Sequence, residues 1–172
     1  PLNSTSSTSL NNDYWLPAVT LTVEPVENLQ LRANASMTLA RPQFRELIFQ
    51  TYYDPETNRQ FNGNPFLVDS ELTNFELRGE YYFGGGDRIS LAGFYKEIDK
   101  PIEAFSRFYA NAQLASFANS PSATLRGVEA DLLYGFDLYT WGGFFEGKEL
   151  LFITNYTYTN AEISVQAGDT TL

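Results

Sequence analysis

Hydrophobic and polar residues alternate with a period of two along several stretches of this chain. The clearest stretch covers residues 29–39. Its odd positions are all apolar and its even positions are all polar: Leu29, Leu31, Ala33, Ala35, Met37 and Leu39 against Gln30, Arg32, Asn34, Ser36 and Thr38. Because successive side chains of a β-strand point to opposite faces, this stretch predicts a strand with one apolar and one polar face.

The same pattern, with varying clarity, predicts six strands. They cover residues 15–23, 29–39, 72–83, 88–98, 124–134 and 150–161. Most hold roughly ten to twelve residues, which is close to the ~9 to 11 residues that a tilted membrane strand needs and longer than the ~5 or 6 residues of a typical soluble strand. The last strand has the least regular alternation.

The connections between these strands alternate in length. A compact turn at Glu24–Asn28 and a glycine turn at Gly84–Gly86 are short, and residues 141–149 form a turn of moderate length. Residues 40–71 and 100–123 are long polar connections. Bacterial outer-membrane barrels have short periplasmic turns and long extracellular loops. The sequence therefore predicts an all-β fold of antiparallel up-and-down strands, a six-strand segment of a large transmembrane β-barrel.

Composition agrees with strands that face two environments. Aromatic residues make up 16% of the chain and charged residues only 19%, and no run of ~18 apolar residues predicts a membrane helix. The mean hydropathy of -0.27 suits strands that alternate apolar and polar residues. Aromatic residues gather near predicted strand ends, as in the girdles of membrane barrels: Tyr14 and Trp15 at one rim, and Tyr81, Tyr82, Phe83, Trp141, Phe144 and Phe145 at the other.

The absence of two residue types excludes several kinds of site. The chain has no cysteine and no histidine, so disulfides, cysteine-ligated or imidazole-ligated metals and a histidine-based catalytic triad are impossible within it. The net charge of -10 disfavours nucleic acid as a partner. No cofactor or metal is expected. The polar stretch 1–12 shows no signal peptide, so an export signal would have to lie upstream.

Several motifs resemble the barrel of TonB-dependent receptors of the Gram-negative outer membrane. They follow the family's order and spacing from about residue 13 to 165: DYWLPA at 13–18, LRA at 31–33, TLARPQFREL at 38–47, GNPFL at 63–67 followed by NFEL at 74–77, FYK at 94–96, RGVE at 126–129 and NYTYT at 155–159. Phe66 and Val68 depart from the family's common form in the GNP motif. The resemblance identifies residues 1–172 as a partial receptor barrel.

This resemblance implies energy-coupled uptake of a scarce solute, such as a metal chelate, a cobalamin or a glycan. The family's barrel has about 22 strands and encloses an N-terminal plug. The expected partners are outer-membrane lipid, the solute, and the receptor's own plug domain and TonB, the last two through parts that this chain lacks. The chain also lacks the family's terminal aromatic strand. Its expected location is the outer membrane of a Gram-negative bacterium.

Six charged residues fall on the predicted lumen-facing side of the strands. Two interpretations stay open: these residues line the solute path or hold the plug, or they form salt bridges that satisfy a wet interior. If the strands at 29–39 and 72–83 pair across their long connection, Arg32 should lie near Glu80 and Ser36 near Glu76. The six residues are Arg32, Glu76, Arg78, Glu80, Glu129 and Asp131.

The first long connection carries residues suited to binding a ligand by stacking and hydrogen bonds. The alternative is a self-packed loop that shields the barrel mouth. The candidate ligand-binding residues are Arg45, Tyr52, Tyr53, Arg59 and Phe61. The second long connection, with Arg107, Phe108 and Tyr109, offers fewer polar groups.

No catalytic residue is expected. Glu76 and Glu80, four residues apart on one strand, would lie ~13 Å from each other, which is too far for a pair of glycosidase acids. The glycines 84–86 form a turn and not a phosphate-binding loop, since no helix and no Lys-Ser/Thr pair follow. The alternative function is a secreted or surface all-β ligand-binding domain that folds alone.

Overall fold

The computed structural model describes residues 11–56, 59–109 and 112–165 of the chain. Most of the polar stretch expected at 1–12, and the chain end at 171–172, lie outside the described residues. Within the described part, no helix has both the length and the apolar character needed to cross a membrane.

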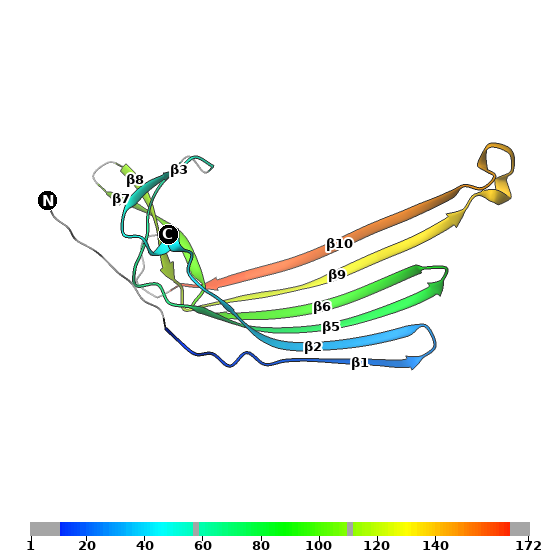
Figure 1. Cartoon of the computed structure of the whole chain (residues 1–172), viewed down its shortest axis with the longest axis horizontal. Helices are drawn as coiled ribbons and strands as arrows, with labels where there is room; N and C mark the ends of the chain where they lie inside the picture. Colours follow the sequence, from blue (N-terminus) through cyan, green and yellow to red (C-terminus); the bar gives the residue numbers. More distant parts are fainter. Residues whose placement is uncertain (1–10, 57–58, 110–111, 166–172) are drawn as a thin grey trace.

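Six long strands form one antiparallel sheet, in which each strand pairs with its neighbours along the sequence (Figure 1). This confirms the all-β class and all six predicted strands, with bounds that differ by up to three residues. The strands are β1 (Ala18–Val26), β2 (Leu29–Ala40), β5 (Ser70–Gly84), β6 (Asp87–Asp99), β9 (Ser122–Asp137) and β10 (Glu149–Ser164).

The turns lie at one end of this sheet and the long connections at the other (Figure 1). Positive φ angles at Gly85 and Gly86, of 64° and 99°, make the tight β5–β6 turn that the glycines predicted. The prediction of a turn over 24–28 was wrong in extent, since β1 continues to Val26 through an irregularity in the ladder. Only Glu27 and Asn28 turn, with Asn28 at φ 67°.

The start of β1 also differs from the expected Trp15. The carbonyl of Pro17 still accepts a hydrogen bond from the Met37 N–H at 2.9 Å. Proline has no N–H to donate in return, so the regular ladder begins at Ala18. Two short 3₁₀ helices, η1 (Tyr139–Trp141) and η2 (Gly143–Phe145), fill the β9–β10 connection.

The two long connections contain strands that the sequence analysis does not predict. They form a second, four-stranded sheet with the order β3-β4-β8-β7, and a short helix α1 (Phe44–Leu47) precedes it. The pattern missed these strands because two of them have only four residues. They are β3 (Thr51–Asp54), β4 (Arg59–Asn62), β7 (Ile102–Tyr109) and β8 (Ala112–Asn119).

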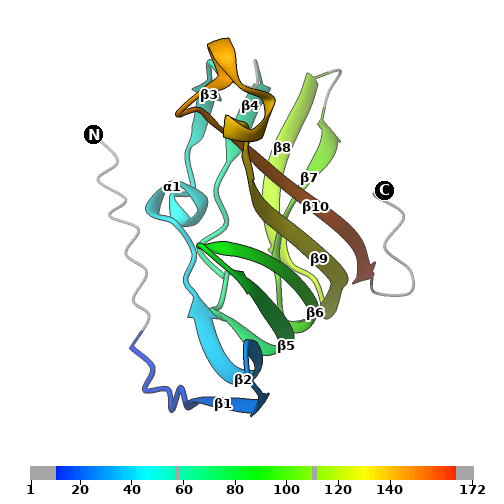
Figure 2. The ribbon, with the colours of Figure 1, turned by 90° about the vertical axis from the view of Figure 1, so that its right-hand side faces the viewer.

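The six-stranded sheet follows an arc (Figure 2). Its two faces differ chemically. The outer face, defined by Leu31, Leu77, Leu91, Val128 and Tyr156, is exposed. Leu77, Leu91 and Tyr156 are each 64% exposed. These side chains therefore do not meet in a closed, protein-lined interior. The inner face carries the alternate residues, which are mostly polar.

A chain of aromatic rings crosses the outer face near the turn end of the sheet. The ring centroids of Tyr81 and Phe83 are 5.2 Å apart, those of Phe83 and Tyr134 are 6.3 Å apart, and those of Tyr134 and Phe136 are 4.6 Å apart. All three pairs meet edge to face. Tyr82 does not join this girdle, because it faces inward and donates a hydrogen bond to Glu80 at 2.7 Å.

The β2–β5 register differs by two residues from the predicted one. Arg32 lies opposite Arg78, not Glu80, and Ser36 lies opposite Asn74, not Glu76. A shift of two leaves every side chain on its own face, so the alternation of apolar and polar residues fits both registers equally well.

Successive hairpins are staggered along the strands. Leu29, the first residue of β2, lies opposite Tyr81, and β5 continues to Gly84, three residues further. Arg88 lies opposite Leu133, so Asp87 is level with residue 134, and β9 again continues three residues further. Three residues are about 10 Å of strand, and two strand spacings are also about 10 Å, which gives a strand tilt of about 45° if the turns lie at one level.

Gly127 provides a test of how closely the sheet is packed. A Cβ atom at this position would overlap the carbonyl oxygen of Tyr158 and lie 2.6 Å from Cζ of Phe94. We expect Gly127→Ala to lower the free energy of unfolding by about 1–3 kcal/mol, as overpacking does. The control is Gly93→Ala, since no atom lies within 4 Å of a Cβ there. Urea midpoints of the protein in detergent measure both, and equal midpoints for the two variants would contradict the packing.

Candidate functional site

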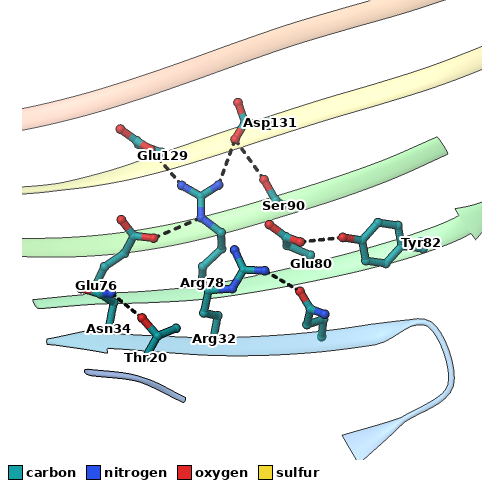
Figure 3. A network of polar contacts seen from close by, with 11 residues as sticks. Thr20, Arg32, Asn34, Glu76, Arg78, Glu80, Tyr82, Ser90, Glu129 and Asp131 are labelled. Carbon is teal, nitrogen blue, oxygen red and sulfur yellow. Dashed lines mark hydrogen bonds and ion pairs between the residues drawn. The ribbon is translucent and has the colours of Figure 1, made fainter. Parts of the chain in front are cut away.

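The centre of the inner face holds an ion network around Arg78 (Figure 3). The Arg78 guanidinium donates through Nε to Glu76 at 3.3 Å and through Nη2 to Glu129 at 3.3 Å. Its Nη1 atom lies 3.5 Å from Asp131. The network joins β5 to β9 across β6, so one cation links two strands that are not ladder neighbours.

Asp131 extends the network to β6 and β10. It accepts hydrogen bonds from Ser90 Oγ at 3.0 Å and from Nδ2 of Asn155. These three residues lie side by side, since Ser90 and Asn155 are the ladder partners of Asp131 on either side. Polar groups therefore continue across four adjacent strands at this level of the wall.

Arg32 and Glu80 lie on the same face but outside this network (Figure 3). Arg32 donates to Gln30 Oε1 at 2.8 Å, and Glu80 accepts from the Tyr82 hydroxyl at 2.7 Å. Within the described ranges, neither forms an ion pair. The structure thus places all six predicted lumen residues on one face and joins four of them, Glu76, Arg78, Glu129 and Asp131.

The network is partly open to water. The Arg78 side chain is 20% exposed, while those of Asp131 and Glu129 are 31% and 34% exposed. One guanidinium faces three carboxylates, so the cluster keeps a negative charge. Among the residues that the structure describes, no three acidic groups converge to hold a metal ion. Such a surface can order water, a polar solute or a charged protein segment.

The two long connections pack together into one folded body, called the loop unit below. It comprises residues 41–69 and 100–121. Phe61 stacks between Tyr52 and Phe117, with centroid distances of 5.8 and 5.6 Å. Leu67, at 2% exposure, and Ala115 complete this core.

Backbone and side-chain bonds join the two connections of the loop unit. Strands β4 and β8 pair in parallel, with Phe61 opposite Ala115. Asn64 Nδ2 donates to the Phe117 carbonyl at 2.9 Å. Asn119 accepts from the Val68 N–H at 2.9 Å and donates to the Val68 carbonyl at 3.0 Å. The two connections therefore form one unit and not two separate loops.

The base of the loop unit contains a buried carboxylate, Asp69, which is 6% exposed. Burial and a hydrogen bond with Asp69 raise the pKa of the nearby Tyr14 phenol, whereas a hydrogen bond with Asn12 lowers it. Tyr14 belongs to the segment that leads into β1. This contact therefore ties the entry of the first strand to the loop unit.

The five predicted ligand-binding residues separate into two groups. Phe61 is buried in the core at 9% exposure, and Tyr52 is half-buried against it. Burial raises the pKa of Tyr52, an effect that the Arg45 charge opposes and that Glu46 and Asp54 reinforce. Arg45, Tyr53 and Arg59 are exposed.

Gln60 is a candidate that the sequence argument missed. It is exposed and lies opposite Tyr53 in the β3–β4 hairpin, so both side chains share the face that points away from the core. The alternation of side chains within residues 59–62 could have identified this position from the sequence. The second connection pairs with this hairpin through the backbone of β8. The structure does not describe the side chains of Arg107, Phe108 and Tyr109.

The chain matches one protein-family model over residues 2–172, and that model is described as TonB dependent receptor-like, beta-barrel. None of the curated protein sequences matches this chain.

Solved structures share the fold at low sequence identity. The siderophore receptor PirA from Pseudomonas aeruginosa has a TM-score of 0.67 and 17% identity over 87% of this chain and 28% of its own. The Serratia marcescens hemophore receptor HasR, a double mutant in complex with its hemophore HasA and heme, has a TM-score of 0.61 and 20% identity over 86% of this chain and 22% of its own.

A mutant of the ferric enterobactin receptor PfeA from Pseudomonas aeruginosa, in complex with enterobactin, has a TM-score of 0.53 and 23% identity, over 70% of this chain and 20% of its own. The chain thus spans between 20% and 28% of the length of these three receptors.

Replacing Arg78 tests the ion network. We expect Arg78→Met to lower the free energy of unfolding by about 1–3 kcal/mol, because three half-buried carboxylates lose their shared cation. Arg32→Met is the matched control, since Arg32 lies opposite Arg78 and bonds only to Gln30 among the described residues. Urea midpoints in detergent measure both. An Arg32→Met loss as large as that of Arg78→Met would show that Arg78 is not the centre of the network.

Asn119 tests the coupling of the two connections. Asn119→Ala removes both bonds to Val68 and the bond from Nδ2 to the Lys100 carbonyl at 2.7 Å. We expect limited proteolysis within 41–69 and 100–121 to become about tenfold faster, as for a loss of about 1.4 kcal/mol in local opening. The control is Asn160→Ala, whose bond to Glu162 lies on β10. An unchanged rate of cleavage in Asn119→Ala would contradict the coupling of the two connections.

Proposed function

The chain belongs to the TonB-dependent receptor-like β-barrel family, and from this premise we propose that it forms six strands of the wall of an outer-membrane receptor that takes up a scarce solute. The barrel would continue from the two edge strands, since β1 pairs only with β2 and β10 only with β9 within the described residues. Unpaired strand edges cannot lie in hydrocarbon without partners for their backbone groups.

One observation carries this proposal: the sheet has an exposed apolar outer face and a polar, ion-paired inner face. On β5, β9 and β10 the outer positions stay apolar or aromatic, apart from one threonine, over nine residues each, 75–83, 128–136 and 150–158. Nine residues match the ~9 to 11 that a membrane strand requires. Both ends of this band carry aromatic residues, as lipid-water interfaces favour.

The alternative, a secreted or surface all-β domain that folds alone, has little support from this arrangement. A soluble domain would cover the outer face with a second layer of structure. Here Leu77, Leu91 and Tyr156 are each 64% exposed, and the apolar core that does exist belongs to the loop unit. An uncovered apolar sheet with two open edges would aggregate in water.

We propose a metal chelate as the solute class. The solved structures with this fold include receptors for siderophores, for enterobactin and for a heme-carrying hemophore. Arg45 and Arg59 are exposed cations on the loop unit with no ion pair in the described part of the chain, and cations suit anionic chelates. Tyr53 and Gln60 would add stacking and hydrogen bonds. Tyr52 and Phe61 would act indirectly by holding the hairpin.

The inner-face network would face the plug or the solute path. Excess carboxylates beside Arg78 suit a partner surface with cationic or N–H donor groups. The plug and the contact with TonB would come from other parts of the receptor, and its location would be the outer membrane of a Gram-negative bacterium. Transport would then need no covalent catalysis by these residues.

Binding to the intact receptor tests the proposal. With ferric enterobactin, haem, cyanocobalamin and maltohexaose as probes, we expect an iron chelate to bind and the double variant Arg45→Ala/Arg59→Ala to weaken that binding about tenfold or more. Lys100→Ala is the matched control, because this cation pairs with Asp99 at 3.5 Å and lies outside the β3–β4 hairpin. Binding of cobalamin or the oligosaccharide alone would refute the chelate assignment.

A further inference from the structure

The outer face contains a hollow of about 650 Å³ between β5, β6, β9 and β10. Its apolar lining consists mainly of outer-face side chains: Phe75, Leu77, Tyr95, Val128 and Tyr158, with Gly93 at its floor. This volume is within the ~300 to 1,000 Å³ of ordinary small-molecule sites. Because the four strands are hydrogen-bonded neighbours, the hollow is formed without any further part of a barrel.

Gly93 creates the hollow. It lies between Leu77 on β5 and Val128 on β9, and a Cβ atom added to it would meet no atom within 4 Å. The next outer pair toward the loop unit, Phe75 and Tyr95, lies directly across the β5–β6 ladder. Large side chains thus stand around a position that has none. A groove of this shape fits a slender apolar chain better than it fits a flat or bulky partner.

The end of the hollow nearer the loop unit is polar. Arg126 and Asn160 lie opposite each other on β9 and β10, and both line the hollow. Arg126 forms an ion pair with Glu162 at 3.3 Å, and the two side chains are 63% and 65% exposed. Exposed pairs contribute little stability, so the guanidinium can exchange this carboxylate for another anion at low cost.

We propose that this hollow is a lipid site, which holds one fatty acyl chain of a membrane lipid while the lipid's phosphate contacts Arg126. The inference rests on the proposed function, because it requires the outer face to contact lipid. Two observations select this occupant. The hollow is continuous with the nine-residue apolar band of the outer face, and its cation stands where that band ends, at the level expected for head groups.

Native mass spectrometry of the intact receptor with palmitoyl-oleoyl phosphatidylglycerol tests the site. We expect Gly93→Leu, which fills the hollow, to weaken the tightest lipid-binding step about tenfold. Thr154→Leu is the control, because it places a leucine at an exposed outer position on β10 opposite Leu132, and neither residue lines the hollow. Arg126→Gln should weaken binding of this lipid but not of palmitoyl-oleoyl glycerol, which has no phosphate. Gly93→Leu should weaken binding of both.

Three outcomes would overturn the site. Equal lipid affinity in Gly93→Leu and the parent receptor would show that the hollow holds no chain. A dimer that Gly93→Leu dissociates would assign the hollow to a second copy of the receptor. Loss of binding in Arg126→Gln for both lipids would remove the phosphate contact. Iron-chelate binding by the same samples is a separate readout, so a failed lipid site and a failed receptor assignment remain distinguishable.

Discussion

The structure depends on strands that separate two solvents while their backbones bond only to one another. Each N–H and C=O in the centre of the sheet pairs across a ladder. The side chains alone therefore decide which face of the sheet contacts lipid and which contacts water. Along each regular stretch of ladder, alternate residues then go to opposite faces. The sheet itself needs no conventional core: Leu67 and Phe61 are buried in the loop unit, while Leu31, Leu77 and Leu91 of the wall stay exposed. Stability against water must come from what covers the outer face.

Most of this wall could be predicted from the sequence, and little of the loop unit could. Period-two alternation predicted the six strands and the apolar face of five of them, because that signal repeats over nine or more residues. Register is a weaker signal. Alternation permits Arg32 opposite Glu80 as readily as opposite Arg78, and no hairpin turn fixes this pairing, because β2 and β5 are joined through the loop unit. β3 and β4 are too short for the pattern, and the pairing of β4 with β8 is nonlocal.

The candidate site shows the same division. Placement of charged residues on the inner face follows from their sequence parity, whereas the ion network depends on register and so was not predictable. Arg78 meets Glu129 and Asp131 only because β6 sets the two strands level, with Ala92 between Arg78 and Glu129. In the loop unit, composition suggested Phe61 as a ligand contact. The parallel β4–β8 pairing instead places its ring in the core, and Gln60 takes the exposed face beside Tyr53.

The geometry of the wall also argues against closure by these six strands alone. At a tilt of about 45° and a strand spacing of about 4.8 Å, a closed barrel of six strands would have a radius of about 7 Å. Side chains that point inward from one side of such a barrel would already reach its axis. The inner face carries long charged side chains on several strands, including Arg32, Arg78 and Glu129, and such groups need water or polar partners around them. A barrel that narrow would bury them against one another. The same residues that make the inner face polar therefore require a wide barrel, with more strands than this chain supplies.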